Sequence, residues 1–185
     1  MTVKEIIKTS ATLLGREDVV NYITGDLKTP DDSTLYTVDA LVRCLNLVVN
    51  ELACTYIPMK KTQTFRSETV YYLTFYEKPL SIIKVTDLDG YDVEYQKFPD
   101  KIVVKKFPFT IEYNYIPKSY ILNDSVGYLD DQISIRALAY GTLSEYSLIE
   151  HAFTESVMWH KKYMDAVAEV CMPKNAKIKS RSWLK

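Results

Sequence analysis

The sequence predicts an α+β protein: a helical bundle with an inserted antiparallel β subdomain and an extended basic C-terminal arm. Three observations indicate this class. Residues 34–56 place apolar side chains in steps of three and four, which is the spacing of one helix face. Residues 60–116 hold short runs of β-branched and aromatic residues separated by turn signals, as strands do. Residues 129–171 return to helical spacing.

A chain of 185 residues normally forms one domain, here with a subdomain. The predicted segments are the N-terminal helices of the bundle at 1–58, the antiparallel β subdomain at 59–117, the C-terminal helices of the bundle at 118–172 and the basic C-terminal arm at 173–185.

The N-terminal segment is expected to form two helices and a loop. Residues 2–14 place apolar side chains on one helix face, and Gly15 ends the helix. A short second helix is expected at 17–23. Residues 25–33, which include Pro30, are a predicted loop.

The long central helix is predicted at 34–56. Ser33 and Thr34 are candidate N-caps, and Pro58 prevents continuation. The apolar positions follow a heptad seam that Leu41 and Val48 widen. The seam consists of Leu35, Val38, Val42, Leu45, Val49, Leu52 and Tyr56. Such a helix is either a core helix or part of a coiled coil, and we expect a core helix.

The strand-rich segment contains five clear runs, spaced about ten residues apart. They lie at 69–75, 80–86, 93–95, 102–105 and 109–115. Because parallel strands need longer crossovers, this spacing predicts an antiparallel meander.

Two helices are expected at the C-terminal end, with residues 150–154 as either a tight connection or a bend. The predicted stripes are Ile133, Ala137, Tyr140, Ser144 and Leu148 on the first helix and Phe153, Val157, Met164, Val167, Ala168 and Cys171 on the second. The small side chains of Ala137, Ala139, Gly141 and Ser144 would allow close approach of a partner helix. Pro173 ends the last helix.

Charge divides the chain into an acidic body and a basic end. The net charge is −1, but residues 173–185 carry five Lys or Arg and no acid, which leaves −6 on the other 172 residues. This balance argues against an electrostatic nucleic-acid binder. The N-terminus lacks a signal-peptide pattern, and no stretch approaches the ~20 apolar residues of a membrane span. We therefore expect a soluble protein made in a reducing compartment.

The sequence shows no catalytic, cofactor-binding or metal-binding constellation, so we do not expect an enzyme. Cys44, Cys54 and Cys171 form no C-x-x-C pair and are expected to be buried apolar residues. His151 and His160 are nine residues apart on one helical segment, so they are expected to face opposite ways.

Acidic residues also fail to form a site in the sequence. Residues 87–92 contain three aspartates, but an EF-hand would place Val85 first and Gln96 twelfth, where neither can bind calcium. A hairpin turn is expected there instead. Glu145, Glu150 and Glu155 are expected on a solvated face. Phosphate-binding and nucleophile-elbow glycine motifs are absent from the sequence.

The basic end is either a solubilising tail or a docking arm. As an arm, its apolar residues would insert into a neighbour while its basic residues meet acids. Trp183 favours the arm, because a tryptophan is seldom left without a pocket. The candidate partner-binding residues are Lys174, Lys177, Ile178, Lys179, Arg181, Trp183 and Leu184.

The order of elements resembles the head–tail connector proteins of tailed bacteriophages, also called adaptor, neck or head-completion proteins. The resemblance rests on a loose pattern of helices and tyrosines over most of the chain. Its parts are residues 13–15, the helix at 34–56, residues 82–85, the Asp89 and Gly90 pair, the strand at 111–115, and residues 138–141, 145–146 and 159–163.

This resemblance implies a structural virion protein that forms a ring, usually of twelve copies, beneath the portal protein and carries the tail or a second neck protein. DNA would pass through the bore without being read. The protein would be made in the bacterial host cytoplasm and reside in the virion neck. The strand segment at 60–116 is longer than in the smallest family members, which leaves open the end of the ring that it faces.

Two other classes remain at this point. A tail-completion, baseplate or other tail structural protein would also be rich in strands and tyrosine. A bacterial regulatory module would need a basic recognition helix, and the predicted helices are acidic or mixed in charge.

Overall fold

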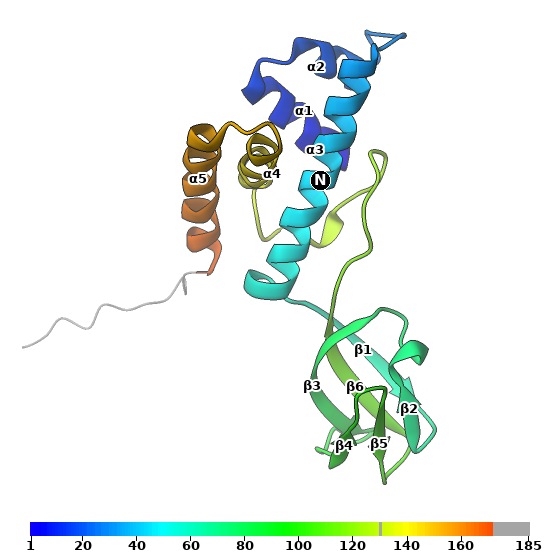
Figure 1. The fold of residues 1–185 in the computed structure, drawn as a ribbon. Coiled ribbons are helices and arrows are strands. Elements are labelled where there is room, and N and C mark those ends of the chain that lie inside the picture. The colour runs from blue at the N-terminus through cyan, green and yellow to red at the C-terminus, as the bar shows by residue number, and fades with distance from the viewer. Residues whose placement is uncertain (130, 172–185) are drawn as a thin grey trace, which may run out of the picture.

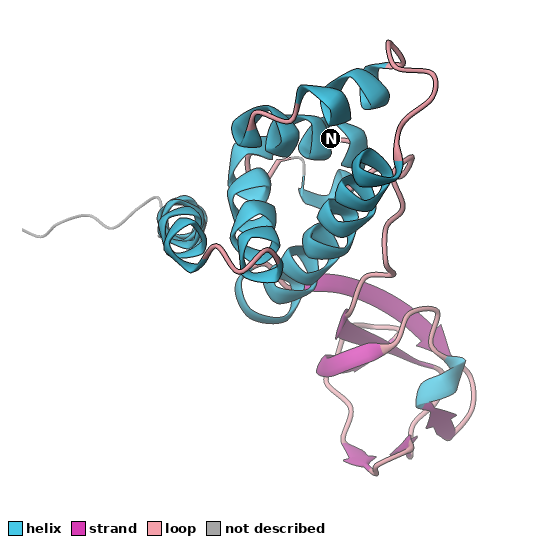
Figure 2. Ribbon diagram, turned by 45° about the horizontal axis from the view of Figure 1, so that its top comes forward, coloured by secondary structure: helices cyan, strands magenta, loops and turns pink. Residues whose placement is uncertain are grey.

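The computed structural model describes residues 1–129 and 131–171 and confirms a mixed α+β fold (Figure 1). In these residues it has five α-helices and two small antiparallel sheets. Figure 2 shows the α-helices gathered on one side and the strands on the other. We call α1–α5 the helical region and residues 59–115 the strand region.

The first two helices form where the sequence predicts them. Helix α1 (Val3–Leu14) begins with a capping box, in which the Thr2 hydroxyl accepts the Glu5 N–H and the Glu5 carboxylate accepts the Thr2 N–H. It ends at Gly15, whose φ of 71° is the left-handed conformation that glycine adopts without strain. Helix α2 (Glu17–Thr24) follows directly.

Helix α3 (Asp32–Glu51) passes into a single π-helical segment, Leu52–Tyr56, so the expected long helix is present. Its N-cap is Asp31, whose carboxylate accepts the Thr34 N–H at 2.8 Å, and the predicted caps Ser33 and Thr34 are wrong. An ionised aspartate two residues earlier offers the stronger acceptor at the positive end of the helix.

The buried stripe of α3 keeps Val38, Leu45, Val49 and Leu52 of the predicted seam but is displaced from Leu35 toward Leu41 and Val48. Leu41 and Val48, expected at its edge, are fully or almost fully buried, whereas Leu35 is 42% exposed. The helix has neighbours on more than one side, because α1, α2 and α4 all contact it. A heptad pattern describes a helix that contacts one partner, so the prediction centred the buried face too close to Leu35.

Within the described residues, six strands make two three-stranded sheets, and every neighbouring pair is antiparallel. The strands are β1 (Met59–Phe65), β2 (Thr69–Tyr71), β3 (Pro79–Asp87), β4 (Tyr95–Lys97), β5 (Lys101–Val104) and β6 (Phe109–Tyr115). The orders are β1-β6-β3 and β2-β5-β4.

The predicted meander is wrong, although the antiparallel pairing is right. Among the strands, β4 and β5 pair as sequence neighbours, while β6, the last strand, lies between β1 and β3. Its Phe109, Ile111 and Tyr113 are fully buried at every second position. Alternation shows which face of a strand is buried, but it does not select the neighbouring strand.

Helices α4 (Ile135–Ile149) and α5 (Phe153–Cys171) form a hairpin, so residues 150–154 hold a tight connection. The predicted stripe of α5 is largely wrong, because Phe153 and Val157 are 62% and 71% exposed. The buried residues of α5 are Ser156, Trp159, Tyr163 and Val167. Helix α5 packs mainly on α4, so one face is covered and the opposite face is left to solvent.

The two regions have separate hydrophobic cores. The helical core is centred on α1, α3, α4 and α5, with Leu41, Leu45 and Leu138 fully buried. The strand core includes Phe109, Ile111 and Tyr113. The main contacts between elements fall within one region or the other. Each region therefore presents its own outer surface.

Candidate interaction surfaces

The predicted arm residues, from Lys174 to Leu184, lie outside the described residues. Their role as a docking arm stays a prediction.

The cysteines do not share one environment. Cys44 is fully buried, and this burial raises the pKa of its thiol to about 12, which leaves little thiolate at neutral pH. Cys54 and Cys171 are exposed, so the expectation that all three are buried is wrong. They lie on the π-helical segment and the last turn of α5, where the helices turn these positions away from the core.

The two histidines lie apart from any cluster of ligands. His151 occupies the α4–α5 connection, outside the helices, with a positive φ of 59°, and His160 is exposed on α5. In the described part of the chain, no group of three or more His, Cys, Asp or Glu side chains is placed to hold a metal ion. None of the helices described here is both long enough and apolar enough to span a membrane.

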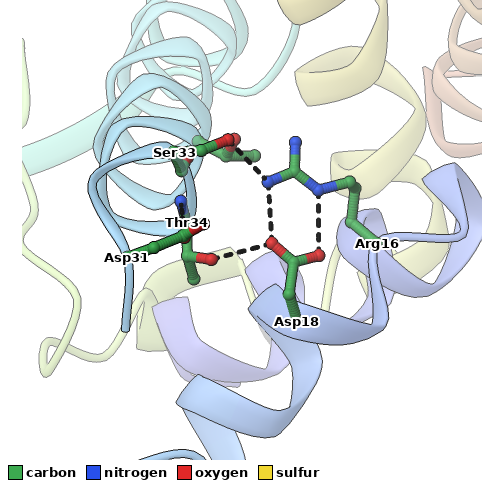
Figure 3. Close-up of polar contacts among 6 residues, drawn as sticks. Arg16, Asp18, Asp31, Ser33 and Thr34 are labelled. Atoms are coloured by element: carbon green, nitrogen blue, oxygen red, sulfur yellow. Dashed lines mark hydrogen bonds and ion pairs between the residues drawn. The ribbon is translucent and has the colours of Figure 1, made fainter. Parts of the chain in front are cut away.

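A polar cluster joins the α1–α2 turn to the start of α3 (Figure 3). Arg16 donates two hydrogen bonds to the Asp18 carboxylate, from Nε at 2.9 Å and from Nη2 at 2.7 Å. Thr34 Oγ1 donates to Asp18 at 2.8 Å. The guanidinium of Arg16 holds the pKa of Asp18 well below its usual range. Because these groups satisfy one another's hydrogen-bonding capacity, the cluster fixes the helix junction and leaves few polar atoms available to bind a ligand.

The 87–92 turn is present as expected and contains an ion pair that the sequence did not predict. The Asp87 carboxylate accepts the N–H groups of Asp89 and Tyr91 at 3.0 and 2.9 Å. It also pairs with Lys106, nineteen residues away. Gly90 adopts a positive φ of 88°, which the turn requires. This arrangement is a structural brace of the strand region.

An open apolar pocket of about 590 Å³ lies on the strand region, lined in part by Tyr72, Leu73, Leu80 and Phe98. Leu73 is 98% exposed. Val70 and Phe75 are both buried although they are five residues apart, so one straight strand could not bury both. A 3₁₀ turn, Tyr72–Thr74, replaces the predicted end of the strand and leaves Leu73 in solvent.

The helical region also exposes apolar side chains, on two helices that lie on either side of α4. Figures 1 and 2 both place α4 between α3 and α5. On α5, Phe153 and Val157 are exposed, and on α3, Tyr36 and Leu47 are exposed. Single exposed apolar residues are normal, but here they recur on the solvent-facing stripes of two helices.

No protein-family model matches the chain, and no curated protein matches it significantly.

Proposed function

We propose that the chain is a structural virion protein, a head–tail connector of a tailed bacteriophage. It would form a ring, with twelve copies expected, beneath the portal protein and join the capsid to the tail or a second neck protein. DNA would pass through the bore without being read in sequence. In this proposal the chain has no catalytic role and no cofactor.

The observation that carries the proposal is the distribution of exposed apolar side chains. They lie on α3 and on α5, at either side of the helical region, and around Leu73 on the strand region. A subunit of a ring between two other assemblies needs contact surfaces on both flanks and at its ends. Large apolar groups left in solvent at such places are typical of protein interfaces.

Electron microscopy and mass measurement of the purified protein test this proposal. A closed ring with a central bore and a mass near twelve subunits is the expected result. A trimer or a hexameric ring would favour a tail-completion or baseplate protein. In particles produced from the genome that encodes the chain, labelled antibodies should bind at the junction of head and tail. Labelling at the distal end of the tail would refute the connector role.

A further inference from the structure

We propose that the solvent-facing stripe of α5 on one copy binds the solvent-facing stripe of α3 on the next copy. This inference rests on the proposed ring and names the two surfaces that close it. The partner is thus a second copy of this chain, joined head to tail.

The α3 stripe comprises Tyr36, Asp39, Arg43 and Leu47, which follow one another in steps of three and four and are all exposed. Leu47 is 55% exposed, and the side chains of Asp39 and Arg43 are 70% and 61% exposed. The order along the helix is apolar, acidic, basic, apolar. These positions lie opposite the buried residues of α3, such as Leu41 and Leu45 in the helical core.

The α5 stripe comprises Val157, Lys161, Asp165 and Ala168, again in steps of three and four and all exposed. Its order is apolar, basic, acidic, apolar, which is the complement of the α3 order. The stripe faces away from the buried Trp159 and Tyr163, which pack toward α4.

Figure 1 shows α3 and α5 running in the same sense, and rotation about a ring axis lying roughly along that common direction keeps that sense between copies. With a helical rise of about 1.5 Å per residue, the matching positions of the two stripes differ by no more than about 1.5 Å along the helix axis. The alignment places Lys161 against Asp39 and Asp165 against Arg43. The apolar residues lie at the two ends of the contact.

Helices α3 and α5 lie on opposite flanks of the helical region, because α4 separates them in both views. Each stripe faces away from the residues that its own helix buries. A contact between different surfaces on opposite flanks is heterologous, and such contacts repeat until a rotation closes them. The segment near Tyr120 runs along one edge of α3, where Asn46 binds the Tyr120 backbone at 2.7 and 2.9 Å. It leaves the stripe exposed, and Ile121, the next residue along the chain, is itself exposed.

Exchanging the two charges within one stripe tests the contact without changing net charge. One variant carries Asp39→Lys and Arg43→Glu, and the other carries Lys161→Glu and Asp165→Lys. In both, opposite charges remain four residues apart on the helix, so folding should be little affected. Each variant should associate at least about tenfold more weakly than the wild type, because two attractions become repulsions.

The decisive variant carries all four substitutions, which restore the charge complementarity between the two stripes. Its self-association, measured by analytical ultracentrifugation at low salt, should return toward that of the wild type. Lys8→Glu, at an exposed lysine on α1, is a charge-reversal control that should leave association unchanged. A wild-type oligomer whose mass is unaffected by either exchange, or is not restored by the combination, overturns this interface alone. A wild-type protein that stays monomeric at the highest concentration reached overturns the ring as well.

Discussion

Gly141 on α4 lies directly against Val48 on α3. A Cβ atom built on Gly141 would fall 2.8 Å from Val48 Cγ1 and 3.0 Å from Cδ2 of Tyr163 on α5. Three helices therefore converge at a position that only glycine fits. Of the small residues predicted to allow close helix approach, Gly141 forms this junction within the helical core.

Gly141→Ala should destabilise the protein by about 1–3 kcal/mol, because the added methyl overpacks a buried junction. The better helix propensity of alanine, about 1 kcal/mol, offsets part of this cost. Chemical denaturation monitored by circular dichroism measures the change.

Val48→Ala provides the matched test of the cause. Alone it should destabilise by leaving a cavity. The double variant with Gly141→Ala should lose less unfolding free energy than the sum of the two single losses, by at least about 0.5 kcal/mol. The smaller side chain at position 48 leaves room for the methyl group at position 141. Strict additivity would show that Val48 is not the residue that excludes a side chain at position 141.

The sequence predicted the helices well because caps, prolines, glycines and periodicity act locally. Gly15 ends α1 and Pro58 follows the long helix, as expected. Periodicity could not identify which element packs against each helix face. Val157 has the spacing of a core residue on α5, yet it is exposed because α5 has one main neighbour.

Strand order failed for a similar reason. Nothing in the residues of β6 distinguishes a central strand from the end of a meander, because both need one buried face. The pocket at Leu73 depends on the 3₁₀ turn that allows both Val70 and Phe75 to be buried. A straight strand would bury only one of them, and the need to bury both is apparent only in the assembled core. Candidate contact surfaces were therefore beyond the reach of local patterns.

The stability of the protein should fall steeply above pH 10. Burial raises the pKa of Tyr163 and of Tyr128 well above the ordinary value of about 10. Below pH 10 these phenols are protonated in both folded and unfolded chains. As the pH rises further, the unfolded chain loses their protons first, and unfolding becomes more favourable.

Absorbance at 295 nm during an alkaline titration measures this effect. Some tyrosinates should appear gradually, and the buried ones should appear together with the loss of helical circular dichroism. Tyr163→Phe should make the stability depend less steeply on alkaline pH, whereas Tyr91→Phe, at an exposed position, should leave the dependence as in the wild type. Smooth ionisation of all tyrosines with the helices intact would contradict this prediction.

Substitutions at Asp87 should destabilise the strand region to an extent that depends on the new side chain. Asp87→Ala removes both the turn acceptor and the partner of Lys106, so it should lower the thermal midpoint most. Asp87→Asn keeps an acceptor for the Tyr91 N–H and should lower it less. Asp89→Asn, on the exposed side of the turn, is the control and should have little effect.

The contribution of Asp87 should also disappear in acid. Hydrogen bonding from Lys106 lowers the pKa of Asp87, so its stabilisation is present above the unfolded pKa of about 3.9 and is lost as the pH falls through the folded pKa. The difference in thermal midpoint between wild type and Asp87→Asn should shrink over this range. A difference that stays constant down to the lowest pH would exclude a charge-dependent role.

The basic end should act as a docking arm for the portal or for a neighbouring copy. Exposed charge pairs contribute only about 0.2–1 kcal/mol each and weaken with salt, whereas a buried aromatic anchor contributes about 2 kcal/mol or more. Trp183→Ala should therefore weaken attachment to the particle more than Lys179→Ala. The amount of each variant recovered in purified particles measures this.

Deleting residues 173–185 separates docking from folding. The deletion should leave the thermal midpoint of the protein unchanged and abolish its attachment. The acidic surface that meets the arm on a neighbouring copy should lie on the helical segments, because residues 1–58 and 118–172 together carry sixteen acidic and nine basic side chains. Residues 59–117 are nearly balanced, with eight acidic and nine basic. Undiminished attachment of the truncated chain would show that the basic end only increases solubility.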